Sequence, residues 1–186
     1  DLPDWPDTVK QQQANWRGRS EGVNIINKVK DLDITYEVYD SIPQTIYAQT
    51  YSIIAPEHPL VLELVKGTEK EKEVMDFVAY IKDKKAKKKF NIETDLEGVF
   101  TGRYIENFLN TGRDLPIWVA SYALYEYGTG AVNCSAHDER DFAFAKKFDI
   151  PLLEVLAPHV VDTINPPDPA KKTVRRKNVH CVVEDE

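Results

Sequence analysis

The sequence is short of cysteine and has no long apolar run. Only Cys134 and Cys181 occur among 186 residues, which argues against a disulfide scaffold and against a zinc site built from paired cysteines. No apolar stretch approaches the roughly 20 residues that a membrane-spanning helix needs. The N-terminal DLPDWPDT is unlike a signal peptide. These absences predict a reduced, cytoplasmic protein that does not enter a membrane.

Positive charge is also in the minority. The chain has 24 Lys and Arg against 31 Asp and Glu, a formal net charge of −7. Such a chain is not suited to coat a nucleic acid, although a local pocket can still bind one RNA end. Apolar residues, at 42%, and aromatic residues, at 10%, are plentiful, which excludes a disordered or collagen-like chain. The length fits one domain with its own core.

Helical and extended patterns alternate in the first half of the chain. Pro6 suits the first position of a helix over 6–16. Residues 34–40 and 45–54 are rich in β-forming side chains and predict two strands. The short segment 41–44 connects them. It contains Pro43, and proline cannot sit inside a central strand.

The strongest helix signal lies at 68–81, after a short helix predicted between Pro59 and Gly67. Thr68 to Glu71 match the capping-box pattern. Apolar side chains then follow the i, i+3, i+4, i+7 spacing of one helical face, at Val74, Phe77, Val78 and Ile81. We interpret the basic run at 82–90 as a solvated helix end, since cations stabilise that end of the helix dipole, rather than as an RNA-binding patch.

The second half of the chain is mostly extended. The stretches 99–105 and 115–127 are β-like, and a tight glycine turn at 128–130 precedes a helix predicted over 138–148. A loop is predicted at 165–169 and a strand at 178–183. This mixture predicts an α+β fold in which short strands form a small β-barrel-like core with helices around it.

The densest polar cluster is GTGAVNCSAHDERD, at 128–141. It places His137, Asp138, Arg140 and Asp141 at the start of a predicted helix, where backbone N–H groups and carboxylates can orient a cationic group and a water. A structural role explains the same residues. Asp138 suits the N-cap of the helix, and Asp141 suits the acidic position of a capping box. Composition alone favours the structural role.

Other chemistries have weaker support in this cluster. A metal site built on His137, Asp138 and Asp141 would need a further ligand, and no HExxH or CxxC motif supplies one. A nucleophilic pair of Cys134 and His137 would need a geometry that a separation of three residues rarely gives. No GxSxG motif of a serine hydrolase is present.

Five segments resemble the editing domain that is inserted in the catalytic domain of bacterial-like leucyl-tRNA synthetases. They follow the order of that family and cover nearly the whole chain. They are NWRGRSEG at 15–22, APEHPL at 55–60, LPIWVA at 115–120, YGTGAV at 127–132, and AHDERD at 136–141 followed by Phe144 and Ala145. The resemblance implies the editing-domain fold of class I synthetases. It also implies that 1–186 is a single editing domain cut from a larger synthetase, with 1–22 and 173–186 as connecting segments to the catalytic domain.

The activity implied by the resemblance is post-transfer editing. Such a domain hydrolyses the ester that joins a wrong amino acid, such as norvaline or isoleucine, to the 3′ end of the leucine tRNA. A second site is needed because one methylene is worth only about 1–3 kcal/mol of discrimination, a problem for which synthetases are the standard example. The implied partners are that tRNA end and the rest of a monomeric synthetase. Editing needs no cofactor, and ATP and Mg belong to the catalytic domain, whose HIGH and KMSKS signatures this sequence lacks.

The resemblance also assigns roles to residues. Asp141 matches the aspartate that binds the substrate's α-ammonium, with Asp138 and His137 beside it and a positioned water as nucleophile. Thr45 matches the side chain that excludes leucine. Further implied substrate-binding residues are Asp40, Ser41, Tyr127, Gly128, Thr129, Gly130, Ala131, Val132, Asn133 and Arg140.

The chain departs from the family pattern at two places. The segment Asp40 to Thr45 stands where the family has Thr-Thr-Arg-Pro-Asp-Thr. Ile42 replaces the arginine of that pattern, and Gln44 replaces its aspartate. Asn133 to Ala136 replace a Met-Ala-Val-Pro-like stretch that is one residue longer. Three hypotheses therefore remain: an active editing hydrolase, a degenerate editing domain that binds the tRNA 3′ end or stabilises its host enzyme, and an unrelated metal-dependent hydrolase.

Overall fold

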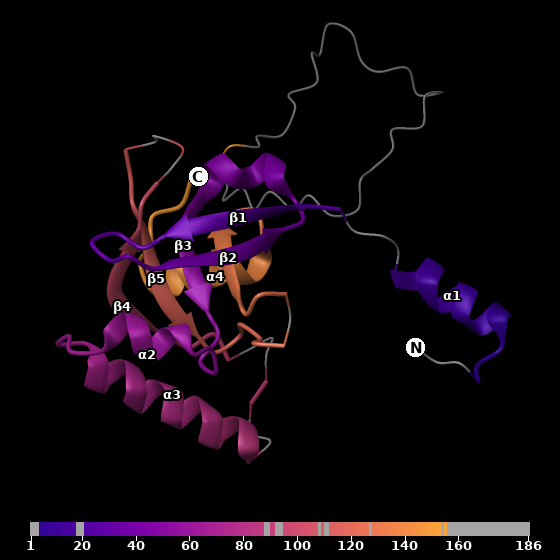
Figure 1. Ribbon diagram of the computed structural model, residues 1–186, viewed down its shortest axis with the longest axis horizontal. Helices are drawn as coiled ribbons and strands as arrows, with labels where there is room; N and C mark the ends of the chain where they lie inside the picture. Colours follow the sequence, from indigo (N-terminus) through magenta and orange to yellow (C-terminus); the bar gives the residue numbers. More distant parts are fainter. Residues whose placement is uncertain are drawn as a thin grey trace, which may run out of the picture.

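A four-stranded mixed sheet forms the centre of the molecule (Figure 1). The computed structural model describes residues 4–17, 21–87, 90–91, 95–107, 109, 112–126, 128–153 and 155. The strands are β1 (Val23–Lys28), β2 (Thr35–Asp40), β3 (Gln49–Ile54), β4 (Gly98–Ile105), β5 (Leu115–Ala120) and β6 (Ala131–Ser135). The helices are α1 (Asp7–Arg17), the 3-10 helix η1 (Pro43–Ala48), α2 (Leu60–Val65), α3 (Glu71–Ala86) and α4 (Glu139–Lys147).

The central sheet has the strand order β4-β5-β3-β6. β3 runs parallel to β5, and the other two pairings are antiparallel. Every residue of β3 is buried, because the sheet is covered on both faces. β1 and β2 form a separate antiparallel hairpin beside the sheet. Among the described residues these two sheets do not close into a barrel, so the predicted α+β class is confirmed and its barrel-like core is not.

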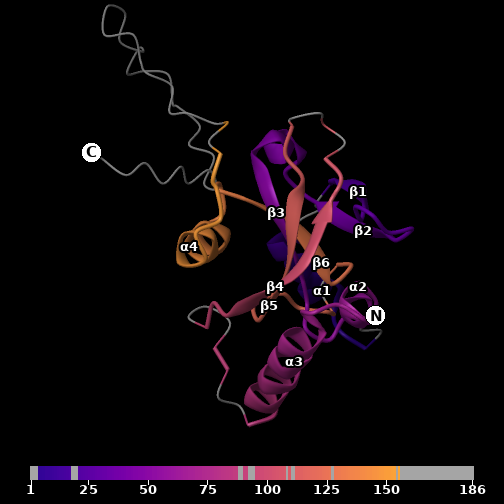
Figure 2. The ribbon, with the colours of Figure 1, turned by 90° about the vertical axis from the view of Figure 1, so that its left-hand side faces the viewer.

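Two apolar clusters cover the two faces of the sheet. Neighbouring residues of one strand point to opposite faces, so Ile54 packs into a cluster with the hairpin, α2 and α3, while Ile53 packs toward α4. Figure 2 shows α3 and α4 well apart, on different sides of the strands. Phe144 of α4 lies so close to β4 that a Cβ on Gly98 would come within 2.5 Å of its ring. This side chain anchors α4 against the sheet and thereby fixes where the helix begins.

The predicted helices are confirmed, with α1, α2, α3 and α4 matching the stretches expected at 6–16, 59–67, 68–81 and 138–148. The capping box at Thr68 is wrong. Its hydroxyl donates to the Val65 carbonyl and so closes α2, while the Glu71 carboxylate accepts from the Gly67 N–H. The first helical residue of α3 follows Lys70, which makes no side-chain cap.

Two strand predictions are wrong in part. Residues 45–48 belong to the 3-10 turn η1 rather than to a strand, because Pro43 fixes a turn-compatible φ and the Thr45 N–H bonds back to the Ile42 carbonyl. The strand expected over 115–127 ends at Ala120, and a turn follows it. The loop at 165–169, the strand at 178–183 and the connecting segment 173–186 lie outside the described residues. The division into one domain with connecting segments stays a prediction.

Candidate active site

The segments that follow β5, form the glycine turn and begin α4 meet around one pocket of about 330 Å³. The end of β2 and one residue of β3 complete it. Its lining residues are Tyr39, Ile53, Tyr122, Ala123, Leu124, Gly128, Thr129, Gly130, Ala131, Val132, Asp138, Arg140 and Asp141. Eight residues of the predicted site therefore come together here, the run 128–132 and three side chains of the HDERD motif.

The glycine turn shapes one wall of this pocket. Gly130 has a φ of 74°, which favours glycine, and a Cβ there would lie 2.9 Å from the Tyr125 ring and 3.0 Å from His58. Its carbonyl accepts from the Ala55 N–H at 2.9 Å, which ties the turn to the end of β3. The chain therefore runs close to its neighbours at Gly130, where only a glycine fits.

Asp138 is the N-cap of α4, as the sequence predicts. Its Oδ1 accepts from the backbone N–H groups of Arg140, at 2.9 Å, and Asp141, at 3.2 Å. The capping-box role expected of Asp141 is not what the structure shows. The Asp141 carboxylate instead accepts a hydrogen bond from the Tyr122 hydroxyl at 3.0 Å. The two aspartates thus have different tasks, and Asp141 is directed into the protein beside the pocket.

The environment of Asp141 disfavours its charge. Burial raises the pKa of its carboxyl to about 7, and the nearby negative charge of Asp138 adds to this rise. Hydrogen bonds from Tyr122 and Cys134 and the charge of Arg140 act in the opposite direction. A desolvated carboxylate at a pocket wall is stabilised strongly by any cation that binds next to it. A shift of this kind is typical of functional sites.

Cys134 lies behind Asp141 and is fully buried. Burial, together with the charge of Asp141, raises the pKa of its thiol, so Cys134 is protonated at neutral pH and unsuited to act as a nucleophile. His137 is not among the residues that line the pocket. Its Nε2 accepts from the Val155 N–H at 3.4 Å, so the Cys–His pair finds no support in the geometry.

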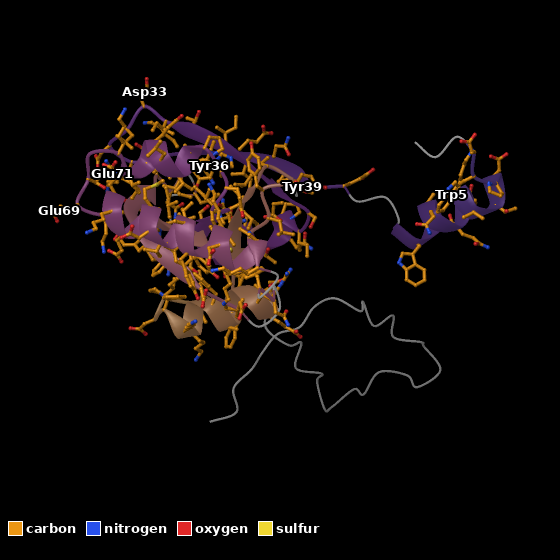
Figure 3. The ribbon with its side chains drawn as sticks, turned by 90° about the horizontal axis from the view of Figure 1, so that it is seen from below. Trp5, Asp33, Tyr36, Tyr39, Glu69 and Glu71 are labelled. Atoms are coloured by element: carbon orange, nitrogen blue, oxygen red, sulfur yellow. The ribbon has the colours of Figure 1, made fainter. Side chains whose placement is uncertain are left out.

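The opposite wall differs from the one the resemblance implies. Asp40, Ser41 and Thr45 do not contribute to the pocket lining among the described residues, and Tyr39 is the residue of this segment that does. Both carboxylate oxygens of Asp40 are engaged, one by the Ile42 N–H and the other by Gln49, each at 2.8 Å. The Thr45 hydroxyl donates to the Ile42 carbonyl. Figure 3 shows Tyr39 nearer than Tyr36 of the same strand to the side of the main body that faces the helix with Trp5.

Asn133, another predicted residue, is not part of the lining. Asn133 is buried, and its amide exchanges hydrogen bonds with Asn27, at 2.9 and 3.2 Å, and also donates to Gln49. Gln49 in turn bonds Asp40, so a chain of amides joins β1, β6 and β3 to the end of β2. Tyr127 lies outside the described residues. The substrate-binding roles of these residues stay predictions.

Sequence reasoning missed Tyr39 and Tyr122. Tyr39 lies near the end of the strand predicted over 34–40, and Tyr122 lies inside the stretch predicted over 115–127. The sequence does not distinguish either position from ordinary packing. Only the strand order, in which β5 pairs with β3 and β3 pairs with β6, brings Tyr122 to the start of α4.

A larger cavity of about 460 Å³ lies on the sheet face near the end of α4, with Phe100, Trp118 and Phe148 among its walls. Its Asp114 is already paired with Lys30 at 2.5 Å, which lowers the pKa of that carboxyl. We therefore assign the chemistry to the smaller pocket, which contains the only carboxylate of the described part whose pKa is raised.

In the same part of the chain, no three His, Cys, Asp or Glu side chains are grouped to hold a metal ion. No described helix is long and apolar enough to span a bilayer.

Comparison with known proteins identifies the family. The family model described as the editing domain of leucyl-tRNA synthetase matches residues 14–180. This chain belongs to that family. A leucine–tRNA ligase from Desulfotalea psychrophila is 41% identical over 168 residues, which is 90% of this chain and 20% of the ligase. The AgnB2 LeuRS of Agrobacterium radiobacter K84, solved in a ternary complex with tRNA and LeuAMS, is 31% identical with a TM-score of 0.66.

The editing domain matches 87% of its length to the solved Agrobacterium enzyme and 19% of that enzyme's chain. The chain thus spans about one fifth of the length of the relatives it matches. The family and the fold predicted from the sequence are confirmed by these matches.

Proposed function

We propose that this editing domain carries out post-transfer editing, the hydrolysis of norvalyl or isoleucyl esters of the leucine tRNA. The observation that carries the proposal is the Asp141 carboxylate, desolvated and held at the wall of a pocket of about 330 Å³. The volume lies in the range of small-molecule sites. Ile53, Leu124 and Val132 supply apolar lining that suits an aliphatic side chain.

In the proposed reaction, Asp141 binds the α-ammonium of the esterified amino acid. The main chain of the glycine turn at 128–130 lies along the substrate. A water attacks the ester carbonyl carbon, its oxygen forms the new C–O bond, and the bond to the ribose oxygen breaks. The ribose oxygen takes the proton that the attacking water loses, which releases the free amino acid and an uncharged tRNA end. Asp138 positions the start of α4 through its two N-cap hydrogen bonds.

The partners in this proposal are the 3′ end of the leucine tRNA and the remainder of a synthetase chain, acting as a monomer in the cytoplasm. The solved relative contains tRNA in its complex, which supports a tRNA partner for this chain. Editing itself uses only the side chains and main chain of the domain, without a cofactor.

The experiment compares deacylation of isoleucyl-, norvalyl- and leucyl-tRNA by a leucine–tRNA ligase that carries this chain. We expect rapid hydrolysis of the first two esters, sparing of leucyl-tRNA, and no loss of rate in chelator. No hydrolysis of any ester would overturn the proposal. Loss of the rate in chelator would favour the metal-dependent hydrolase instead.

One observation favours a second function, binding of the tRNA end without efficient hydrolysis. The Asp40 carboxylate is held by internal hydrogen bonds, and the segment 40–45 has lost the arginine and the aspartate of the family pattern. In that case a non-hydrolysable 3′-aminoacylated adenosine would bind, while isoleucyl-tRNA would survive. Binding of this analogue, measured together with isoleucyl-tRNA deacylation, therefore separates the two functions.

A further inference from the structure

Two buried tyrosine hydroxyls bond Asp141 at different places. Tyr122 donates to the carboxylate Oδ1 at 3.0 Å, and Tyr51 donates to the backbone carbonyl at 2.8 Å. The two hydroxyl oxygens are 3.5 Å apart. Each hydroxyl has one hydrogen, and each hydrogen is already directed to Asp141. The tyrosines therefore act as a clamp on this one residue.

The clamp is rigid because its rings are packed. Tyr51 is 0% exposed and Tyr122 is 7% exposed. Phe144 of α4 stacks on the Tyr51 ring at 5.7 Å and meets the Tyr122 ring edge-on at 5.4 Å. Burial raises the pKa of both tyrosines above the ordinary value of 10.0, so both hydroxyls are protonated donors at neutral pH.

The groups that face Asp141 come from four parts of the fold. Among them, Tyr122 has the largest effect in favour of the ionised carboxylate, and Asp138 has the largest opposing effect of any charged neighbour. Among the described residues, the set is Asp138 at the N-cap of α4, Arg140 on α4, Tyr122 after β5, Tyr51 on β3, and Cys134 on β6. Loss of the Tyr122 hydroxyl would raise the pKa of Asp141 further.

We propose that Tyr122 is a positioning residue of the editing site, whose hydroxyl fixes the Asp141 carboxylate in the orientation that receives the substrate's α-ammonium. The inference rests on the proposed function of Asp141. A carboxylate can rotate about its χ2 bond, and a charged hydrogen bond from a packed donor removes that freedom. Tyr51 holds the main chain of the same residue, so backbone and side chain are fixed together.

Tyr122→Phe tests the proposal, because it deletes one oxygen and keeps the packed ring. The matched control is Tyr36→Phe, which removes an equally buried hydroxyl that bonds Ser52 at 2.9 Å, away from Asp141. Isoleucyl-tRNA deacylation is measured from about pH 6 to about pH 9 in a leucine–tRNA ligase that carries each variant. We expect Tyr122→Phe to lower kcat/KM roughly tenfold at pH 7, mainly through KM, and to move the acid limb upward by about one pH unit. Tyr36→Phe is expected to keep the parental profile.

A second readout separates this inference from the proposed function. It follows the Asp141 carboxyl by NMR titration and the binding of a non-hydrolysable 3′-isoleucylamino adenosine. If the parent does not hydrolyse isoleucyl-tRNA, the proposed function fails, yet a raised Asp141 pKa and roughly tenfold weaker analogue binding in Tyr122→Phe still support the positioning role. A Tyr122→Phe variant with parental titration and parental binding would overturn the inference.

Discussion

At the scale of single residues, the site depends on the different environments of two aspartates three positions apart. Asp138 is exposed and uses its carboxylate to cap α4, while Asp141 is half-buried beside two tyrosines and a thiol. Identical chemical groups thus acquire a structural role and a proposed substrate-binding role. The burial that raises the pKa of Asp141 has a cost in stability, which can be measured.

Asp141 makes the folded state less stable as pH rises. Its pKa of about 7 in the folded chain lies above the ordinary value of 3.8, so the folded state holds the extra proton between these values. The stabilisation from the neutral carboxyl is therefore present near pH 4 and is lost as pH rises through about 7. We expect Asp141→Asn to stabilise the chain by about 1–3 kcal/mol at pH 8, after allowance for partial exposure, and to have little effect near pH 4.

Urea denaturation at the two pH values provides the measurement. Asp114→Asn is the control of opposite sign, because Lys30 lowers the pKa of Asp114 and that variant loses stability at pH 8. An Asp141→Asn chain that is less stable than the parent at pH 8 would show that the carboxylate is not desolvated.

At the scale of elements, the start of α4 sets the position of Asp141. Residues 139–141 form the first turn of the helix, and the Asp138 carboxylate accepts from two of their N–H groups. Phe144, one turn further on, packs the helix onto the sheet beside Gly98. The N-cap at Asp138 and the packing of Phe144 together determine the direction of the Asp141 side chain.

Variants of the cap separate its geometry from its charge. Asp138→Ala removes both hydrogen bonds and is expected to cost about 1 kcal/mol of stability. Asp138→Asn keeps a good cap and removes the charge, so we expect near-parental stability with a lower pKa for Asp141. Chemical denaturation and an NMR titration of Asp141 measure the two effects. Equal stability losses in the two variants would contradict the assigned cap.

At the scale of the whole molecule, polar contacts join the hairpin to the sheet. Asn27 and Asn133 exchange two hydrogen bonds between β1 and β6, and Gln49 extends the chain of amides to Asp40. The end of β2, which carries Tyr39, is thereby held next to the pocket formed by the sheet and α4.

Asn133→Ala tests whether this residue is structural. The change leaves the buried Asn27 amide without its partner, so we expect a loss of about 2 kcal/mol in the free energy of unfolding. The KM for isoleucyl-tRNA is expected to stay near that of the parent under conditions where the variant is folded. A raised KM with parental stability would instead support the substrate-binding role that the resemblance implies for Asn133.

Local patterns predicted those features whose cause is local. The apolar spacing of 74–81 and the N-cap at Asp138 act within one or two helical turns, and both are confirmed. The capping box predicted at Thr68 is not formed, because the Thr68 hydroxyl donates to the Val65 carbonyl at the end of α2. The contacts of Tyr122 and Tyr51 with Asp141 were not predicted. These residues lie 19 and 90 positions from Asp141 in the sequence, and only the strand order brings them together. Composition singled out the polar cluster 128–141, which contains the run 128–132, and the resemblance added the expectation that this run lines a substrate pocket.

The rate of isoleucyl-tRNA deacylation after Asp141→Ala tests the central claim most directly. The substitution is compared with Glu139→Ala, which removes an exposed acid from the same helical turn, in a leucine–tRNA ligase that carries this chain. We predict a loss of roughly a hundredfold or more for Asp141→Ala, because an ammonium would lose its buried charged partner, and a parental rate for Glu139→Ala. Hydrolysis at the parental rate by the Asp141→Ala variant would contradict the account.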